Sequence, residues 1–252
     1  AADGLRGRHV LEPVAGLSHA RNRALKEARA EFVLFVDDDQ ILDQRILLEF
    51  VQCQAEFQCQ VVAGHAPVKY PEGTAPWRQG YFEPTPVPYG RELDEAGTNC
   101  LFLETRSLGL LEPPYFDPRL NFSGGEDIDF TVRLHQRGAK IVSNPKAVAW
   151  ENFPVERTTV PYILKRTYRN WVVGTQLQRS LKGRTAGRML LTAAKRSMVG
   201  AATAVPLLLR GGKGSLTGIV HMVEAAAIVA SLLGAGSDFY RSSTSRTTSP
   251  PV

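Results

Sequence analysis

The stretch EFVLFVDDDQ at residues 31–40 constrains the fold more than any other part of this sequence, because five consecutive apolar residues run directly into three aspartates. A run that is apolar on both faces is typical of a central strand in a parallel sheet, with helices covering both sides. Three adjacent carboxylates repel one another, so a cation or a set of donors is expected opposite them. The stretch therefore predicts a buried strand with an acidic ligand site at its carboxyl end.

Helical and strand patterns alternate around this stretch. Apolar residues recur at helical spacing or in short runs over four segments, which predict helices at 17–28 and 43–57 and strands at 60–68 and 98–104. This alternation is the pattern of an α/β fold, and ligands of open parallel sheets bind beyond the carboxyl ends of the strands. We expect a Rossmann-like, mostly parallel sheet flanked by helices, with the ligand site at the aspartates.

The aspartate triplet suits a divalent cation. On a strand, residues i and i+2 face the same side, so Asp37 and Asp39 would converge while Asp38 points elsewhere. Mg²⁺ or Mn²⁺ is commonly held by one or two carboxylates together with the phosphates of a ligand. The alternative is an acidic turn followed by a helix cap, which is about as common for an isolated triplet.

A second acidic cluster, GGEDID, begins a predicted helix that closes near Gly138. Glu126 and Asp127 fall in its first turn, where the helix dipole favours negative charge without any further function. The two preceding glycines also let the backbone approach a ligand, and a carboxylate there could act as a general base toward a hydroxyl. Both interpretations stay open for this cluster alone.

Taken together, five stretches resemble one known family. They are GLSHARNRAL, EFVLFVDDDQ, TNCLFLETRSL, FDPRLNFSGGEDIDFTVRLHQRGAKI and NPKAVAWENFPVERTT. In this order and at this spacing, over roughly residues 11–170, the sequence is similar to the inverting family 2 glycosyltransferases of the GT-A fold, particularly bacterial enzymes that build exopolysaccharides and other surface glycans.

The resemblance implies roles for individual residues. Asp39, assisted by Asp37 or Asp38, would hold the metal that bridges the diphosphate of a nucleotide-diphosphate sugar, the expected donor. Many members carry a further metal-ligating histidine where this sequence has Glu151, and a carboxylate can also bind Mg²⁺ or Mn²⁺. The residues expected to contact the nucleotide sugar are Asp38, Arg21, Asn22 and Asn99.

On the acceptor side, Asp127 matches the aspartate of the family's ED pair, which deprotonates the acceptor hydroxyl, and Glu126 would orient the base or the acceptor. The proline-rich residues 67–90 are expected to form an extended loop, where Trp77 and Tyr81 could stack on an acceptor sugar. Aromatic loop residues more commonly cover the core, and that alternative stays open.

The beginning of the chain departs from the family pattern. Family members start with a strand, a helix and a second strand that ends in acidic residues, whereas this sequence opens at the equivalent of the third element. We therefore expect a fragment that lacks about one βαβ unit, roughly 30 residues or more, and that binds its donor weakly or not at all.

Charge divides the chain sharply. Residues 1–156 carry 16 basic and 23 acidic side chains, whereas residues 157–223 carry 12 basic and none acidic. Apolar runs separate the basic residues, a pattern of helices that lie on anionic membrane surfaces. The alternatives are a helical hairpin packed on the catalytic body and, for residues 215–236, a membrane span. Three dispersed cysteines suit a reducing compartment.

We thus expect a catalytic domain at 1–175, a membrane-associating helical segment at 176–240 and a disordered tail at 241–252. The enzyme would act on a lipid-linked or other glycan acceptor at the cytoplasmic face of a bacterial plasma membrane. Two rivals are a non-catalytic membrane-associated transferase fragment and a metal-dependent nuclease or nucleotidyltransferase. Nucleic acid is not an expected partner, because aliphatic rather than aromatic residues separate the basic ones.

Overall fold

The computed structural model describes residues 7–209 and 216–236, so the tail expected at 241–252 lies outside the described residues. The helices are α1 (Leu17–Glu27), α2 (Ile46–Phe57), α3 (Glu126–Gln136), α4 (Val160–Ser180), α5 (Ala186–Leu209) and α6 (Thr217–Leu232), with short 3₁₀ helices η1 (Pro76–Arg78), η2 (Thr105–Leu110), η3 (Pro118–Leu120) and η4 (Val155–Thr158). The strands are β1 (Phe32–Val36), β2 (Gln40–Leu42), β3 (Val61–His65), β4 (Val68–Lys69), β5 (Glu92–Leu93), β6 (Cys100–Glu104) and β7 (Ile141–Asn152).

The sheet has the strand order β1-β6-β3-β7-β2, and β4 and β5 also pair with the long strand β7. Strand β7 is parallel to β3 and β4, whereas the pairings β1–β6, β3–β6, β2–β7 and β5–β7 are antiparallel. The expected α/β class is confirmed, but the expectation of a mostly parallel sheet is wrong. The sheet is mixed, and most of its described pairings are antiparallel.

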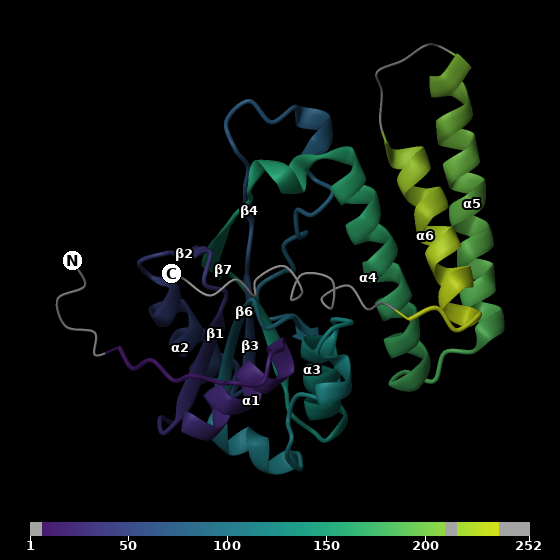
Figure 1. Ribbon diagram of the computed structural model, residues 1–252. Helices are drawn as coiled ribbons and strands as arrows, with labels where there is room; N and C mark the ends of the chain where they lie inside the picture. The colour runs from purple at the N-terminus through teal and green to yellow at the C-terminus, as the bar shows by residue number, and fades with distance from the viewer. Residues whose placement is uncertain (1–6, 210–215, 237–252) are drawn as a thin grey trace, which may run out of the picture.

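Helices cover both faces of the sheet, as Figure 1 shows. Alternate residues of each strand point to opposite faces, so Val61 joins one core cluster and Val62 the other. The first cluster includes Leu25 of α1 and Phe130 of α3, and the second includes Phe50 of α2. Three layers result, with α2 on one face and α1 and α3 on the other.

Strand β1 differs from its expected central position. Both of its faces do pack on the core, with Val33 and Phe35 against one cluster and Phe32 and Leu34 against the other. However, β1 ends the strand order of the described residues and pairs only with β6, in antiparallel register. Apolar periodicity reveals which faces of a strand are covered, but it does not reveal which neighbours it pairs with.

The last three helices form a separate layer beside the body. Helix α4 contacts η4, which precedes it in the chain, and it packs against α6. In Figure 1, α6 lies between α4 and α5. No helix in the described ranges is long and apolar enough to span a membrane. Helix α4 continues through residue 175, so the domain boundary expected there falls inside a helix, and the division into domains stays a prediction.

Candidate active site

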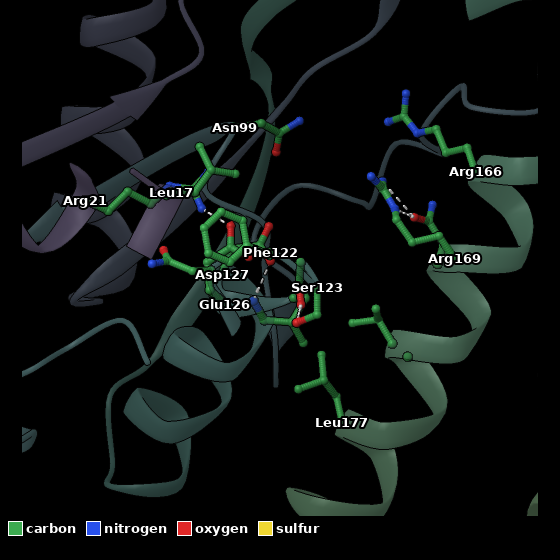
Figure 2. A pocket seen from close by; sticks show the side chains of 18 of the residues that line it. Leu17, Arg21, Asn99, Phe122, Ser123, Glu126, Asp127, Arg166, Arg169 and Leu177 are labelled. Carbon is green, nitrogen blue, oxygen red and sulfur yellow. Dashed lines mark hydrogen bonds and ion pairs between the residues drawn. The ribbon is translucent and has the colours of Figure 1, made fainter. Parts of the chain in front are cut away.

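A cavity of about 1140 Å³ lies between the carboxyl end of β1, the start of α3 and one face of α4. Figure 2 shows its side chains, with Arg21, Glu126 and Asp127 on one side and Arg166, Arg169 and Leu177 of α4 on the other. Of the residues predicted from the sequence, eight line it: Arg21, Asp37, Asp38, Asp39, Asn99, Glu126, Asp127 and Glu151. The two acidic clusters therefore border one cavity.

The aspartate triplet forms a turn between β1 and β2, not a continuation of the strand. The turn is closed by the Gln40 amide, which donates to the Asp37 carbonyl at 3.3 Å, and by Gln40 Oε1, which accepts from the Asp37 amide at 2.9 Å. Asp37 and Asp39 are partly buried, whereas Asp38 is exposed. The three aspartates therefore alternate in burial as expected for a strand, although they lie in a turn.

The second cluster depends on the glycines before it. Gly125 caps α3 with φ of 86°, and a Cβ at this position would lie 2.7 Å from side-chain atoms of both Leu177 and Val173. Only a glycine combines this backbone conformation with so close an approach. The first turn of α3, with Glu126 and Asp127, is thereby held directly against α4, and this contact closes one end of the cavity.

Hydrogen bonds fix the loop that carries Asn99 beside Asp127. Thr131 Oγ1, buried in α3, donates to the Ala96 carbonyl at 2.8 Å and accepts from the Ala96 amide at 3.0 Å. A Cβ on Gly97 would lie 3.0 Å from Asn99 Oδ1 and 3.4 Å from Asp127 Oδ2. The absence of a side chain at Gly97 therefore leaves room for Asn99 and Asp127 to face the same space.

Glu151 reaches the aspartate turn from β7. Its neighbour across the sheet is Gln40, and Arg157 Nη1 lies 3.2 Å from Glu151 Oε1 and 3.7 Å from Asp39 Oδ2. Burial raises the pKa of Glu151, and the charges of Asp39 and Asp37 raise it further, against the influence of nearby arginines. A cation that enters the cavity would stabilise the ionised form of this carboxylate.

The pKa of Asp37 is raised for the same reasons as that of Glu151. Its pKa is raised mainly by burial and further by the negative charges of Asp39, Asp127 and Asp38, while Arg21 opposes the rise. The contribution of Asp127 shows that the triplet and the start of α3 are close enough to interact.

The carboxylates of the acidic wall are candidate ligands for a divalent cation. In the part of the chain that the structure describes, no three His, Cys, Asp or Glu side chains are grouped closely enough to form a complete metal site. Mg²⁺, however, is usually held by one or two carboxylates plus substrate phosphates. One or two of the partly buried carboxylates of Asp37, Asp39 and Glu151 are enough to hold a cation of that kind, shared with a bound diphosphate.

One face of α4 forms the opposite wall, and most of it was not predicted from the sequence. Its cavity-lining residues recur at helical spacing and change from aromatic and basic to apolar along the helix: Tyr162, Arg166, Arg169, Asn170, Val173, Gly174, Leu177, Gln178 and Leu181. That spacing is a usable signal, but only once the helix is known to pack against the Gly125 turn. Arg157, on η4, was also missed.

The guanidinium of Arg166 is stacked on aromatic side chains. It lies over the rings of Phe82 and Phe153, with centroid distances of 4.6 and 5.8 Å, and its Nε is buried with no partner in the described structure. Arginine is well suited to planar recognition of phosphate. The cavity thus has an acidic wall, a basic wall opposite, and apolar side chains toward Leu181 that lie beside the Lys182–Glu95 ion pair.

Three predicted residues are not among those that line the cavity. The Asn22 side chain donates to the Phe116 carbonyl at 2.7 Å and accepts from its amide at 3.0 Å, so it joins α1 to the segment before α3. Tyr81 is partly buried in the proline-rich loop. Trp77 belongs to η1, but its side chain lies outside the described residues.

The chain is similar to known proteins. A family model described as "Glycosyltransferase like family 2" matches residues 8–174. The succinoglycan biosynthesis protein ExoM of Rhizobium meliloti (strain 1021) is 27% identical over 231 residues, which are 90% of this chain and 74% of ExoM.

Two solved structures are also similar. One, S. aureus TarS, is 19% identical with a TM-score of 0.43, over 69% of this chain and 29% of TarS. The other, TarS 1–349 in complex with UDP-GlcNAc, is 17% identical with a TM-score of 0.45, over 86% and 62%. The chain thus spans less than two thirds of either structure. With the family model over most of its length, this chain belongs to glycosyltransferase family 2 and is a glycosyltransferase, as the sequence motifs predicted.

Proposed function

We propose that this chain transfers a sugar from a nucleotide-diphosphate sugar to a hydroxyl of a glycan acceptor, with inversion at the anomeric carbon. The observation that carries the proposal is the meeting of the aspartate turn and the Glu126–Asp127 pair in one cavity. A single displacement needs a base on the acceptor side and stabilisation of the leaving group on the other. The two acidic clusters supply these on separate segments.

Asp127 would act as the base. Its Oδ1 accepts from the Ile128 amide at 2.8 Å, while Oδ2 faces the space beside Asn99. The acceptor oxygen would attack the anomeric carbon from the face opposite the nucleoside diphosphate, and its proton would pass to Asp127 as the bond to the leaving oxygen breaks. Glu126, paired with Arg21, would orient the acceptor.

Asp39, assisted by Asp37 or Glu151, would hold Mg²⁺ or Mn²⁺ together with the donor's diphosphate. When bound, the cation supplies charge stabilisation for the departing diphosphate. Asp38, exposed in the same turn, would reach the donor ribose, and Asn99 would contact the donor sugar or acceptor.

A lipid-linked glycan is the acceptor that we propose. The cavity joins charged walls to apolar side chains, which are Val173 and Leu177 of α4, Leu181 at its C-cap, and Ile128 and Val132 of α3. Such a mixed lining suits a sugar carried on an apolar chain. The similarity to a succinoglycan biosynthesis protein supports exopolysaccharide synthesis as the setting, at the inner face of the plasma membrane.

The test is a transfer assay on the full chain with a panel of nucleotide sugars and lipid-linked glycans. Asp127→Asn should lower kcat by at least a hundredfold, since a positioned base typically contributes 10²–10⁴-fold. It should leave nucleoside diphosphate affinity nearly unchanged, and chelation of divalent cations should abolish transfer and weaken diphosphate binding. NMR of the product should show the inverted anomer.

Asp43→Asn is the matched control, because Asp43 is exposed just beyond the aspartate turn and does not line the cavity. It should transfer at the unaltered rate. Full turnover by a folded Asp127→Asn protein, or a product with retained configuration, would refute the proposed mechanism.

A further inference from the structure

The exposed face of α6 is an unbroken apolar stripe. Beyond Thr217 at its first position, the exposed residues of the helix and its C-cap follow a spacing of three and four: Ile219, Met222, Ala226, Val229 and Leu233. The large ones are 45%, 51%, 39% and 83% exposed in chain order. The charged residue of this helix, Glu224, is buried instead. A stripe of this kind is normally covered in a folded protein.

Helix α5 continues the apolar surface. Leu190, Leu191 and Met198 are 49%, 72% and 69% exposed, and the exposed positions between and beyond them include Ala194 and Ala201. Met222 of the α6 stripe packs directly against Gly200 of α5, where a Cβ would lie 2.9 Å from its Cγ. The apolar stripe of α6 therefore adjoins α5.

Basic residues border this surface. Arg188 and Lys195 are exposed two turns apart on α5, and Arg184 is exposed just before the helix. No acidic residue occurs in the sequence between Arg157 and Val223. An apolar face flanked by arginine and lysine is the pattern of a surface that inserts between anionic lipid headgroups.

Helices α5 and α6 form a hairpin that is firmly attached to α4. Arg196 lies over the Trp171 ring of α4 at 4.9 Å and donates to Glu224 Oε2 at 2.8 Å, and Glu224 also pairs with His221. Ser231 of α6 donates to the Val172 carbonyl of α4 at 3.0 Å. The buried polar groups thus face α4, and beyond Thr217 the exposed positions of α6 carry only apolar side chains.

We propose that the exposed face of α6 and the adjoining residues of α5 (Leu190, Leu191 and Met198), here called the hairpin face, dock on an anionic phospholipid bilayer. This rests on the proposed function only in that a lipid-linked acceptor must be reached at a membrane. The described helices do not qualify as spans, which leaves insertion at the interface. A second copy is disfavoured as the occupant, because the basic borders of two hairpins would repel each other.

The test is co-sedimentation of the full chain with vesicles of pure phosphatidylcholine and of phosphatidylcholine mixed with phosphatidylglycerol. The unaltered protein should bind the mixed vesicles more strongly. Met222→Asp with Val229→Asp should weaken this binding at least tenfold, because two acids replace exposed apolar groups that the bilayer would bury. Arg188→Glu with Lys195→Glu should weaken binding to the anionic vesicles by a similar factor, and high salt should do the same.

Each double variant has a matched control in the α/β part of the protein, outside α5 and α6. Leu47→Asp with Val51→Asp makes the same change at residues of α2 that are 58% and 51% exposed, far from the hairpin in Figure 1. Lys26→Glu with Arg29→Glu reverses two exposed charges at and just beyond the end of α1. Both controls should bind vesicles like the unaltered protein, and circular dichroism should show all four variants folded.

Three results would overturn the proposal: no binding to anionic vesicles, equal losses in hairpin variants and controls, or a dimer in light scattering that Met222→Asp with Val229→Asp dissociates. Nucleoside diphosphate affinity, measured without vesicles, reports separately on the active site. A failure of membrane docking can therefore be told apart from a failure of the proposed transferase function.

Discussion

The guanidinium of Arg21, on α1, donates to the carboxylate of Glu126 at the first position of α3. The other carboxylate oxygen of Glu126, Oε2, is buried with no partner among the described residues. Burial raises the pKa of Glu126 and the charge of Asp127 raises it further, while Arg21 opposes both. This ion pair therefore joins two of the sequence motifs and places a cation beside the buried carboxyl group of Glu126 at the cavity wall.

Removing Arg21 should destabilise the protein. The side chains of Arg21 and Glu126 are 16% and 4% exposed, so Arg21→Ala leaves a nearly buried carboxylate without its cation. We expect the free energy of unfolding to fall by about 1–3 kcal/mol, measured by urea denaturation. Arg21→Ala with Glu126→Gln should recover part of that loss. A double variant no more stable than Arg21→Ala would show that the charge of Glu126 is not what Arg21 compensates.

The acidic wall should make folding less favourable as the pH rises. Asp37 has its pKa raised mainly by burial, so between its unfolded value of 3.8 and its higher folded value the native state binds more protons than the unfolded state. Stability then falls as the pH rises through that window and stays reduced above it. Asp37→Asn should therefore melt a few degrees higher than the unaltered protein at pH 7, and this advantage should vanish at about pH 3.

Asp117 provides the contrast for that measurement. Its pKa is lowered, chiefly by its hydrogen bond with Arg119, so its stabilising contribution is present above the unfolded value of 3.8 and is lost as the pH falls. Asp117→Asn should melt at a lower temperature than the unaltered protein at pH 7. If both variants shift the melting temperature in the same direction at pH 7, the assigned electrostatics of the acidic wall are wrong.

The two glycines before α3 should respond differently to substitution. Gly124 and Gly125 both have φ of 86°, but a Cβ meets nothing within 4 Å at Gly124 and lies 2.7 Å from Leu177 and Val173 at Gly125. Gly124→Ala should lose about 1–2 kcal/mol from backbone strain alone. Gly125→Ala should lose an additional 1–3 kcal/mol, because overpacking moves α4. Equal losses in chemical denaturation would show that α4 is not held tightly there.

The sequence predicted the two acidic motifs well because each is local. Asp37–Asp39 follow directly from an apolar run, and Asp127 follows from glycines that begin a helix. Strand pairing was not predictable in the same way, because apolar residues on both faces of β1 do not distinguish an antiparallel neighbour from a parallel one. Leu47 and Val51 of α2 are apolar like the buried Phe50, yet both are exposed because the sheet covers only a narrow face of this helix.

The wall of α4 escaped prediction for a tertiary reason. Arg166 lies far along the chain from the acidic motifs, and it faces them only because α4 packs against Gly125. The spacing of Tyr162, Arg166 and Arg169 marks one helix face, but the sequence does not say what that face meets. The acidic wall of the cavity could therefore be predicted from the sequence, and the structure adds the arginines and apolar side chains of α4.

Arg166 should contribute to binding of the donor's diphosphate. Its Nε is buried without a partner in the described structure, and the rings of Phe82 and Phe153 hold the guanidinium in place. A charge-assisted hydrogen bond to phosphate contributes about 1.5–3 kcal/mol. Arg166→Ala should therefore raise the Kd for a nucleoside diphosphate about tenfold or more in calorimetry.

Two further variants make that measurement specific. Arg166→Lys keeps the charge but loses the planar fork, so it should recover only part of the affinity. Lys165→Ala removes the neighbouring positive charge on the exposed side of α4, outside the cavity, and should leave the Kd within a factor of two. If Lys165→Ala weakens binding as much as Arg166→Ala, the long-range field of the helix, and not a phosphate contact in the cavity, accounts for the affinity.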